Sequence, residues 1–228
     1  MHGKEKVNII MPVYNEEKTL KEIIGRVLAQ KAVDRLIIVN DHSGDRSLEI
    51  IKSLKKKDKR ISYFTNESNM GKGYSVRRGL KEVDNGIVII QDADLEYYPE
   101  DYGKLLSNLR DDTFVLGTRV RANTGHKYIL ASFVNACLTF EFNFVNGKDL
   151  TDINTCYKVF KKKMLAGVEL QQNGFLLDLE ILSELVKKGY NVREVSVRYK
   201  GRTYKEGKKI TAKDAVEQVF FIIKSRFD

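Results

Sequence analysis

The sequence predicts an α/β protein with a Rossmann-like, mostly parallel β-sheet flanked by helices. Three observations support this prediction. The first half of the chain alternates short apolar runs with segments whose apolar residues recur at helical spacing. The apolar runs are continuous rather than alternating, which is typical of strands covered on both faces. The 228 residues are 42% hydrophobic, which is enough for one large core.

The first half is expected to contain five strands separated by helices. The strands are Val7–Met11, Leu36–Val39, Ile61–Phe64, Ile87–Ile90 and Phe114–Leu116. One helix face is marked by Leu20, Ile23, Ile24, Val27 and Leu28, and a second by Leu48, Ile51 and Leu54. A third helix is expected over Tyr74–Val83. A fourth begins at Pro99, because proline is tolerated at the first helical position.

The second half has a different pattern. Its longest apolar stretch, Ile129–Val145, is interrupted by polar residues and is too polar to span a bilayer alone. This stretch can either pack on the sheet or lie against a membrane face. A helix over Leu177–Lys188 and a strand over Asn191–Val197 follow, and then a basic loop, Arg198–Ile210. The last segment, Thr211–Phe227, is amphipathic, so we expect a C-terminal amphipathic helical extension.

Composition excludes several classes of protein. No stretch reaches the roughly 18–20 apolar residues of a membrane span. Cys137 and Cys156 match no zinc or redox spacing and are expected to be reduced thiols of a cytoplasmic protein. The three histidines are scattered, so a histidine-based metal site is not expected. The net charge of +9 suits nucleic acid, anionic lipid or phosphorylated ligands.

The most informative polar segment follows the fourth predicted strand. Asp92, Asp94 and Glu96 alternate directly after the buried run Ile87–Ile90. Ligands of parallel sheets bind at the carboxyl ends of the strands, so these carboxylates are expected in a binding site. Burying so much negative charge is costly without a cation, and an oxygen-only set suits Mg²⁺ or Mn²⁺. A solvated acidic turn is the alternative.

The loops after the other strands also place polar residues at this edge. Glu16 can contact a ligand, or it can simply favour the start of the next helix through the helix dipole. Asp41 stands where a carboxylate often accepts a ribose hydroxyl. Gly71-Lys72-Gly73 is not a P-loop, but its glycines can admit a phosphate to backbone amides. Arg119 suggests a phosphate or carboxylate partner, with a surface ion pair as the alternative.

The ordered set of motifs resembles glycosyltransferase family 2, and most of all its dolichyl-phosphate mannose or glucose synthases and polyprenyl-phosphate relatives. The resemblance covers essentially the whole chain. The motifs are Pro12-Val13-Tyr14-Asn15-Glu16, Asp41-His42-Ser43-Gly44-Asp45, Asn69…Gly71-Lys72-Gly73, Asp92-Ala93-Asp94, Gly117-Thr118-Arg119, Thr151-Asp152…Thr155-Cys156-Tyr157-Lys158-Val159-Phe160 and the run Gly201–Ile210.

The resemblance implies a single GT-A domain over residues 1–228 that inverts the anomeric carbon of a nucleotide-sugar. Residues 1–120 would bind the donor and 121–228 the acceptor. The implied donor-binding residues are Pro12, Tyr14, Glu16, Asp41, Lys72, Asp92, Ala93, Asp94 and Arg202. Asp94 and Arg202 would be catalytic, with Arg202 on the donor diphosphate. Asp92, Asp94 and Glu96 would hold Mg²⁺ or Mn²⁺. Arg119 and Ser132 would hold the acceptor phosphate.

The chain also departs from the family pattern. Glu96 stands where the synthases usually have glutamine, and His42 replaces a glycine. The chain has no tryptophan, so the Q-x-x-R-W element of processive synthases is absent. Some members that glycosylate hydroxyls use a late carboxylate base. Asp178 and Glu180 are the nearest candidates, but the start of a helix explains them equally well.

These residues are compatible with three candidate functions. The leading hypothesis is metal-dependent transfer of a hexose from a UDP- or GDP-sugar to dolichyl or polyprenyl phosphate. It implies a cytoplasmic protein peripherally bound at the inner face of a membrane, with a possible membrane-protein partner. The second is transfer to a sugar or protein hydroxyl. The third is a non-catalytic nucleotide- or nucleic-acid-binding protein, although an acidic cluster repels nucleic acid, so no nucleic-acid partner is expected.

Overall fold

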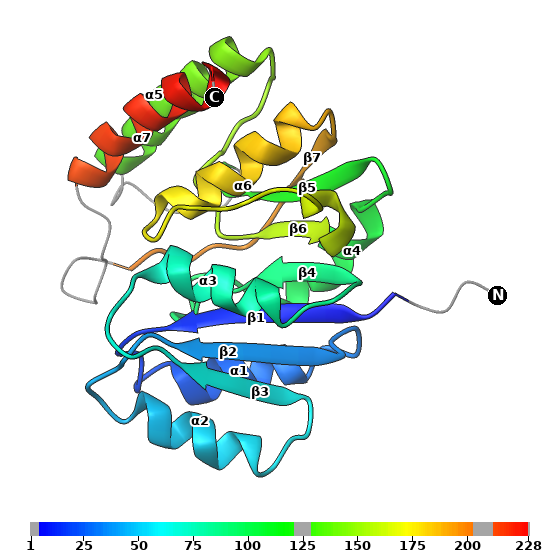
Figure 1. Cartoon of the computed structure of the whole chain (residues 1–228), viewed down its shortest axis with the longest axis vertical. Helices are drawn as coiled ribbons and strands as arrows, with labels where there is room; N and C mark the ends of the chain where they lie inside the picture. Colours follow the sequence, from blue (N-terminus) through cyan, green and yellow to red (C-terminus); the bar gives the residue numbers. More distant parts are fainter. Residues whose placement is uncertain (1–4, 121–128, 203–211, 228) are drawn as a thin grey trace.

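The computed structural model describes residues 5–120, 129–202 and 212–227. Within these ranges, seven strands form one sheet in the order β3-β2-β1-β4-β6-β5-β7 (Figure 1). The strands are β1 (Val7–Val13), β2 (Arg35–Asn40), β3 (Ile61–Thr65), β4 (Ile87–Ile90), β5 (Thr113–Thr118), β6 (Lys158–Lys161) and β7 (Asn191–Ser196). Among the strands of the described ranges, only β6 runs against its neighbours, β4 and β5, so the sheet is mostly parallel, as predicted.

Helices cover the sheet. They are α1 (Leu20–Leu28), α2 (Ser47–Lys55), α3 (Lys72–Lys81), α4 (Tyr102–Asn108), α5 (Ile129–Asn146), α6 (Leu176–Lys187) and α7 (Ala212–Phe227), with short 3₁₀ turns η1 (Pro99–Asp101) and η3 (Lys162–Leu165). α3 packs on β1 and β2, and α6 lies beside it on the same side of the sheet (Figure 1). α5 and α7 lie side by side over the second half of the chain.

The strands form the core because their apolar side chains are covered from both sides. Ile9, Ile10, Ile37, Val88 and Ile89 are all fully buried. Consecutive residues such as Ile9 and Ile10 point to opposite faces of the sheet, so both faces must be apolar. The positions of β1 to β5 confirm the five strands predicted in the first half.

The register of the central strands builds a common polar edge. Val13, at the end of β1, pairs with Asn40, at the end of β2. β4 ends earlier, because its last residue Ile90 pairs with Ile10. The chain after β4 therefore passes beside the end of β1, and the loops after β1, β2 and β4 meet at one place. That place is where the site is found.

The structure differs from the prediction mainly at β6. Lys158–Lys161 overlaps one of the quoted motifs but is not predicted as a strand, because only two apolar residues lie between its two lysines. It is the antiparallel strand inserted between β4 and β5. Most of the predicted basic loop, residues 203–211, lies outside the described residues.

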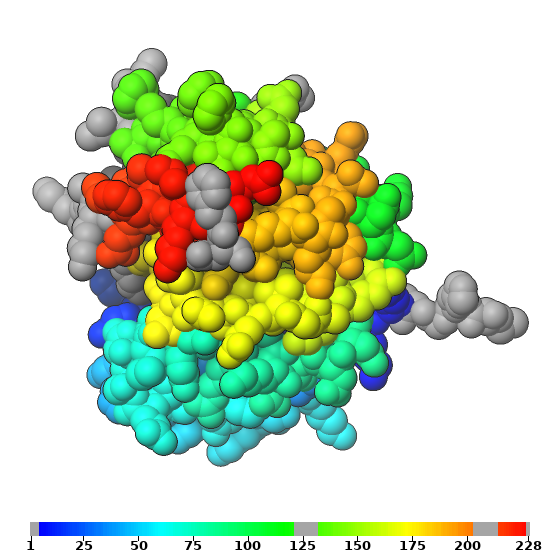
Figure 2. Space-filling view, turned by 45° about the horizontal axis from the view of Figure 1, so that its top comes forward, coloured from blue at the N-terminus to red at the C-terminus, as the bar shows by residue number. Residues whose placement is uncertain are grey.

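α5 and α7 form the amphipathic extension expected from the sequence. Their inner sides are covered, as at Leu138, Phe142 and Ile222. Their outer sides expose large apolar residues: Phe133, Phe140 and Phe144 on α5, and Val216, Phe220 and Ile223 on α7. We call these six residues the apolar face. Figure 2 shows α5 in green and α7 in red side by side at the surface. No helix in the described ranges is both long and apolar enough to cross a bilayer.

Candidate active site

A cavity of about 770 Å³ lies at the carboxyl ends of β1, β2 and β4 and reaches α5, α6 and α7. All but one of the predicted site residues line it: Pro12, Tyr14, Glu16, Asp41, Lys72, Asp92, Ala93, Asp94, Glu96, Arg119 and Arg202. Residues from both halves of the chain therefore share one cavity. Such a cavity is large enough for a small-molecule ligand.

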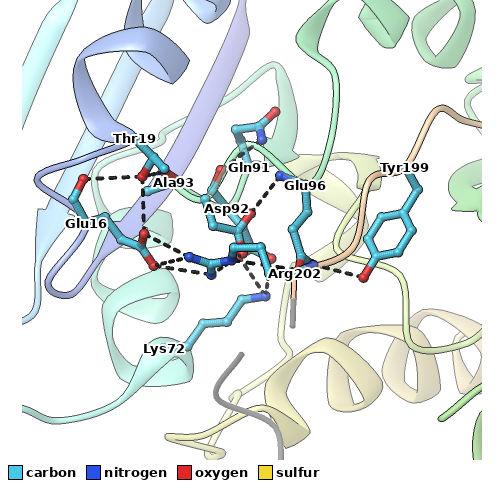
Figure 3. A network of polar contacts seen from close by, with 10 residues as sticks. Glu16, Thr19, Lys72, Gln91, Asp92, Ala93, Glu96, Tyr199 and Arg202 are labelled. Atoms are coloured by element: carbon cyan, nitrogen blue, oxygen red, sulfur yellow. Dashed lines mark hydrogen bonds and ion pairs between the residues drawn. The ribbon is translucent and has the colours of Figure 1, made fainter. Parts of the chain in front are cut away.

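Arg202 and three carboxylates form one charged cluster in the cavity, here called the Arg202 cluster (Glu16, Asp94, Glu96 and Arg202). The guanidinium Nη2 lies 2.7 Å from Asp94 Oδ2, and Nη1 lies 3.1 Å from Glu16 Oε2. Figure 3 shows Arg202 between Glu16 and Glu96. The carboxylates raise the pKa of Arg202 above its usual value, although burial opposes them. The guanidinium thus balances much of the negative charge of the acidic segment.

Glu96 holds the segment that carries Arg202. Its Oε1 accepts the backbone N–H of Arg202 at 2.7 Å, and its Oε2 accepts the Tyr199 hydroxyl at 3.0 Å. The backbone N–H of Lys200 donates to the Glu96 carbonyl at 2.9 Å. Both carboxylate oxygens of Glu96 therefore accept hydrogen bonds from the segment after β7. This role differs from the predicted ligation of a metal.

Burial and the neighbouring carboxylates of Asp92 and Glu96 raise the pKa of Asp94 to about 7. Arg202 opposes this shift but does not cancel it. The charged form of Asp94 is therefore disfavoured in this structure, and a cation bound beside it would stabilise that form.

Lys72 is the centre of a second cluster, here called the Lys72 cluster (Lys72, Asp92, Lys158 and Asp178). Its ammonium lies 2.9 Å from Asp92 Oδ1 and 2.8 Å from Asp178 Oδ2. Burial disfavours the charged amine, but Asp178 and Asp92 outweigh it and raise the pKa of Lys72 well above its usual value. Lys158 is fully buried, and its ammonium lies 3.7 Å from Asp178 Oδ1. Lysines and carboxylates therefore alternate along this cluster.

The glycines on either side of Lys72 allow the start of α3 to lie close to the loop before α6, which is about a hundred residues further along the chain. A Cβ at Gly73 would lie 2.5 Å from the Gln172 carbonyl oxygen, and one at Gly71 would lie 2.5 Å from that of Asn173. The backbone N–H of Tyr74 donates to the Asn173 carbonyl at 3.1 Å. In this structure the glycines therefore let α3 meet the loop before α6, whereas the sequence had suggested room for a phosphate.

Asp41 organises the loop after β3. Its Oδ1 accepts hydrogen bonds from the Asn66 side chain at 2.7 Å and from the Met70 N–H at 2.9 Å. Its Oδ2 accepts the Gly71 N–H at 2.8 Å. Asp41 lines the cavity and is 3% exposed, so these bonds use most of its capacity as an acceptor.

Arg119 also lines the cavity and forms a forked ion pair with Asp152. Nε lies 2.8 Å from Oδ2 and Nη2 lies 2.8 Å from Oδ1. Burial opposes ionisation of Asp152, but Arg119 outweighs it and lowers the pKa of that carboxyl. The guanidinium also lies 5.2 Å from the centre of the Tyr199 ring. The ion pair that was the alternative interpretation is therefore present, although it is not at the open surface.

Ser132 is the predicted site residue that the structure does not bring to the cavity. It is exposed on α5 and does not line the cavity. Asn135, three residues further along the helix, lines it instead and donates to Asp152 Oδ1 at 3.1 Å. Residues three apart lie on the same side of a helix, about 60° apart, so Ser132 and Asn135 are neighbours and only Asn135 is rotated far enough to line the cavity.

Other residues of the site were not selected from the sequence. Gln91 is fully buried below the acidic segment and accepts the hydroxyls of Tyr102 and Tyr157 at 2.7 and 2.8 Å. Its amide donates to the Asp92 carbonyl at 2.9 Å, which fixes the start of that segment. Asp178 was considered from the sequence, yet the start of a helix explained it equally well. Its contacts with Lys72 and Lys158 distinguish it.

The residues fit a divalent cation only in part. No three carboxylate, histidine or cysteine side chains converge as ligands within the described ranges. Asp92 and Asp94 remain suitable, because Mg²⁺ is commonly held by one or two carboxylates together with substrate phosphates and water. Lys72 and Arg202 now neutralise these two carboxylates, so a bound cation would compete with both basic groups.

Comparison with known proteins gives the same fold. A solved structure of glucosyl-3-phosphoglycerate synthase from Mycobacterium tuberculosis, in complex with Mg²⁺ and UDP, superposes with a TM-score of 0.74 at 17% identity. The match covers 97% of this chain and 79% of that one. At this level of identity the likeness concerns the fold alone.

Two curated relatives are more similar in sequence. The dolichol-phosphate mannosyltransferase of Pyrococcus furiosus is 27% identical over 219 residues, which cover 90% of this chain and 60% of the relative. The undecaprenyl-phosphate 4-deoxy-4-formamido-L-arabinose transferase of Photorhabdus laumondii is 28% identical over 169 residues, which cover 71% of this chain and 50% of the relative. The chain thus spans half to three-fifths of the length of these relatives.

A family model provides the assignment. The model of glycosyl transferase family 2 matches residues 8–168, which is more than half of the chain and includes the acidic segment and both clusters except Asp178 and Arg202. The match, the GT-A fold and the cavity at the strand ends agree with one another. The chain therefore belongs to glycosyl transferase family 2.

Proposed function

We propose that this glycosyltransferase moves a hexose from a UDP- or GDP-sugar to the phosphate of a dolichyl or polyprenyl lipid, with inversion and with help from Mg²⁺ or Mn²⁺. The main support for this proposal is the lining of the cavity. A single cavity connects the Arg202 cluster with Arg119 and continues to the inner sides of α5 and α7, where it is lined by Val134, Leu138 and Ala215. This order of charged and apolar walls suits a phosphate attached to a lipid.

The donor would lie along the acidic segment. Pro12, Tyr14 and Asp41 line the cavity and would bind the nucleoside. Arg202 would hold the diphosphate, and a cation at Asp92 and Asp94 would supply further neutralisation of its charge. Arg202 is suited to this role because a guanidinium binds phosphate oxygens in a fork and keeps its charge. Stabilising the leaving diphosphate is the main electrostatic demand of the reaction.

The acceptor would be activated by its own charge. A phosphate monoester is an anion near neutral pH, so it can attack the anomeric carbon without a protein base. Arg119 would position it with the guanidinium nitrogens that Asp152 leaves available. The new bond forms between a phosphate oxygen and the anomeric carbon, and the bond from that carbon to the donor diphosphate breaks. The attack from the opposite side explains inversion.

The apolar face favours binding of the protein to a membrane surface. Phe140 is 71% exposed and Phe144 is 83% exposed, which is costly in water. The same two helices line the cavity with their inner sides. A helix pair lying in the boundary between headgroups and acyl chains would cover the apolar face and bring the lipid phosphate to the cavity. We therefore propose peripheral binding at the cytoplasmic face of a membrane, with a membrane protein as a possible partner.

A donor panel followed by an acceptor assay tests this function. UDP-Glc, UDP-Gal, UDP-GlcNAc and GDP-Man are each added with Mn²⁺ or Mg²⁺, and the thermal midpoint is measured. The best donor, radiolabelled in its sugar, is then incubated with a polyprenyl phosphate in vesicles. We expect label in the organic phase. Label found only in an aqueous glycan would support transfer to a hydroxyl instead, and binding of none of the four donors would overturn the proposal.

A further inference from the structure

One oxygen of a buried carboxylate in the cavity has no hydrogen-bond partner among the described residues. Asp178 is 9% exposed and lines the cavity. Its Oδ2 accepts a hydrogen bond from Lys72 at 2.8 Å. Its Oδ1 accepts none within the described ranges, and the Lys158 ammonium stays 3.7 Å away. Leaving a buried acceptor unpaired is unfavourable, so this oxygen is suited to receive a donor from a ligand.

The fold holds this carboxylate in place from two sides. Asp178 lies in the first turn of α6, and Lys72 lies in the first turn of α3. The close contact of Gly71 and Gly73 with the loop before α6 fixes the distance between these two helix starts. Asp178 therefore cannot turn away from the cavity without losing Lys72. A ligand would meet an acceptor that is already oriented.

The position of Asp178 identifies the part of the donor that would reach it. Lys72 Nζ contacts both Asp178 and Asp92, so Asp178 lies next to the acidic segment. Pro12 and Tyr14, which line the same cavity, would bind the nucleoside. With the diphosphate at Arg202, the remaining part of the donor is its sugar.

We propose that Asp178 is an anchor for a hydroxyl group of the donor's sugar, and that Lys72 and Lys158 position it. The inference rests on the proposed function, because it requires a nucleotide-sugar in the cavity. A carboxylate accepts hydrogen bonds from sugar hydroxyls and has none to donate. The two lysines balance its charge, which suits binding of a neutral hydroxyl better than removal of its proton. The site thus selects donors by the position of one hydroxyl.

Binding measurements on matched ligands test the inference. Calorimetry with Mn²⁺ compares the best donor of the panel, its nucleoside diphosphate and its monodeoxy analogues, on the wild type and on Asp178→Asn. We expect one deoxy analogue to bind the wild type about 10- to 100-fold more weakly than the parent donor. The Asp178→Asn variant should bind the parent donor no more tightly than this deoxy analogue. The nucleoside diphosphate should bind both proteins equally.

The controls separate this role from a structural one. Asp149→Asn removes an exposed carboxylate outside the cavity and should leave every affinity unchanged. Asp178→Ser serves as a second variant if Asp178→Asn fails to fold. Equal loss of affinity for the donor and the diphosphate, or a deoxy penalty that persists in the variant, would overturn the anchor. A wild type that binds no donor would instead overturn the proposed function, and the anchor with it.

Discussion

The Arg202 cluster and the Lys72 cluster differ in how the fold holds their cations. Lys72 lies on α3 and its partner Asp178 on α6, two helices fixed by glycine contacts. Arg202 follows β7 and is held by hydrogen bonds from its own segment to Glu96. The first cluster is built into the packing, whereas the second depends on polar contacts that a ligand can replace. We infer that the Lys72 cluster supports the site and that the Arg202 cluster rearranges around the donor.

The largest expected effect is on catalysis, at Asp94. Asp94→Ala should lower transfer by about 10³-fold, because it removes a proposed cation ligand beside the leaving diphosphate. It should not lower the thermal midpoint of the metal-free protein, since it relieves crowding among the carboxylates that raise the pKa of Asp94. Transfer assays and thermal melts measure the two effects. Full transfer by this variant would exclude a role for Asp94.

Arg202→Ala should lower transfer by about 10²-fold through loss of charge at the diphosphate. Arg202→Lys should restore part of the rate, because the charge returns without the fork. Steady-state kinetics with the best donor measure both variants. If the alanine variant kept its rate but lost thermal stability, Arg202 would be structural and the comparison between the clusters would fail.

Lys72→Met should mainly affect stability. It leaves Asp92 and Asp178 without their shared cation, which for a largely buried ion pair costs on the order of 3 kcal/mol. Chemical denaturation measures the free energy of unfolding. Lys57→Met, at an exposed position, is the control and should change little. An unfolding free energy equal in both variants would contradict the supporting role of Lys72.

Gly73→Ala should also destabilise the protein, by about 1–3 kcal/mol, because the new Cβ would meet backbone atoms of Gln172 and Asn173. Gly103→Ala is the matched control in α4, where a Cβ would meet no atom within 4 Å. It should be neutral or slightly stabilising, since alanine favours a helix. Equal melting temperatures would show that the contact between α3 and the loop before α6 is not tight.

The smallest expected effect is a pH dependence of cation binding. Asp94 must lose its proton to bind a cation, and its pKa is raised to about 7. Affinity for Mn²⁺ should therefore rise with pH, by about tenfold between about pH 6 and pH 8. Titration of the nucleotide-free protein with Mn²⁺, followed by electron paramagnetic resonance, measures it. An affinity that is constant or falls over this range would contradict the shift.

The sequence was most informative where a local pattern determines the structure. Asp92 and Asp94 could be placed in the site because they follow a fully apolar strand, and strand ends meet at one edge. β6 could not be predicted, because two lysines enclose two apolar residues and its burial comes from its neighbours in the sheet. Ser132 was misplaced relative to the cavity because the sequence does not show how α5 is rotated about its axis.

Contacts between segments that are distant in the chain could not be predicted from the sequence. Lys72 and Asp178 are 106 residues apart, and nothing in either local pattern points to the other. The partners of Glu96 are also distant, at Tyr199 and Arg202. For such residues the type of chemistry could be predicted, but the partner that determines the role could not. These are the residues whose proposed roles depend most on the structure.

Mass spectrometry of the lipid recovered from a reaction with polyprenyl phosphate, Mn²⁺ and the best donor tests the proposed reaction directly. We predict that the lipid gains one sugar attached to its phosphate, and that Asp94→Ala forms almost none of this product. Unmodified lipid, together with transfer of the same sugar to a hydroxyl acceptor, would contradict the proposed acceptor and the roles assigned to Arg119 and the apolar face.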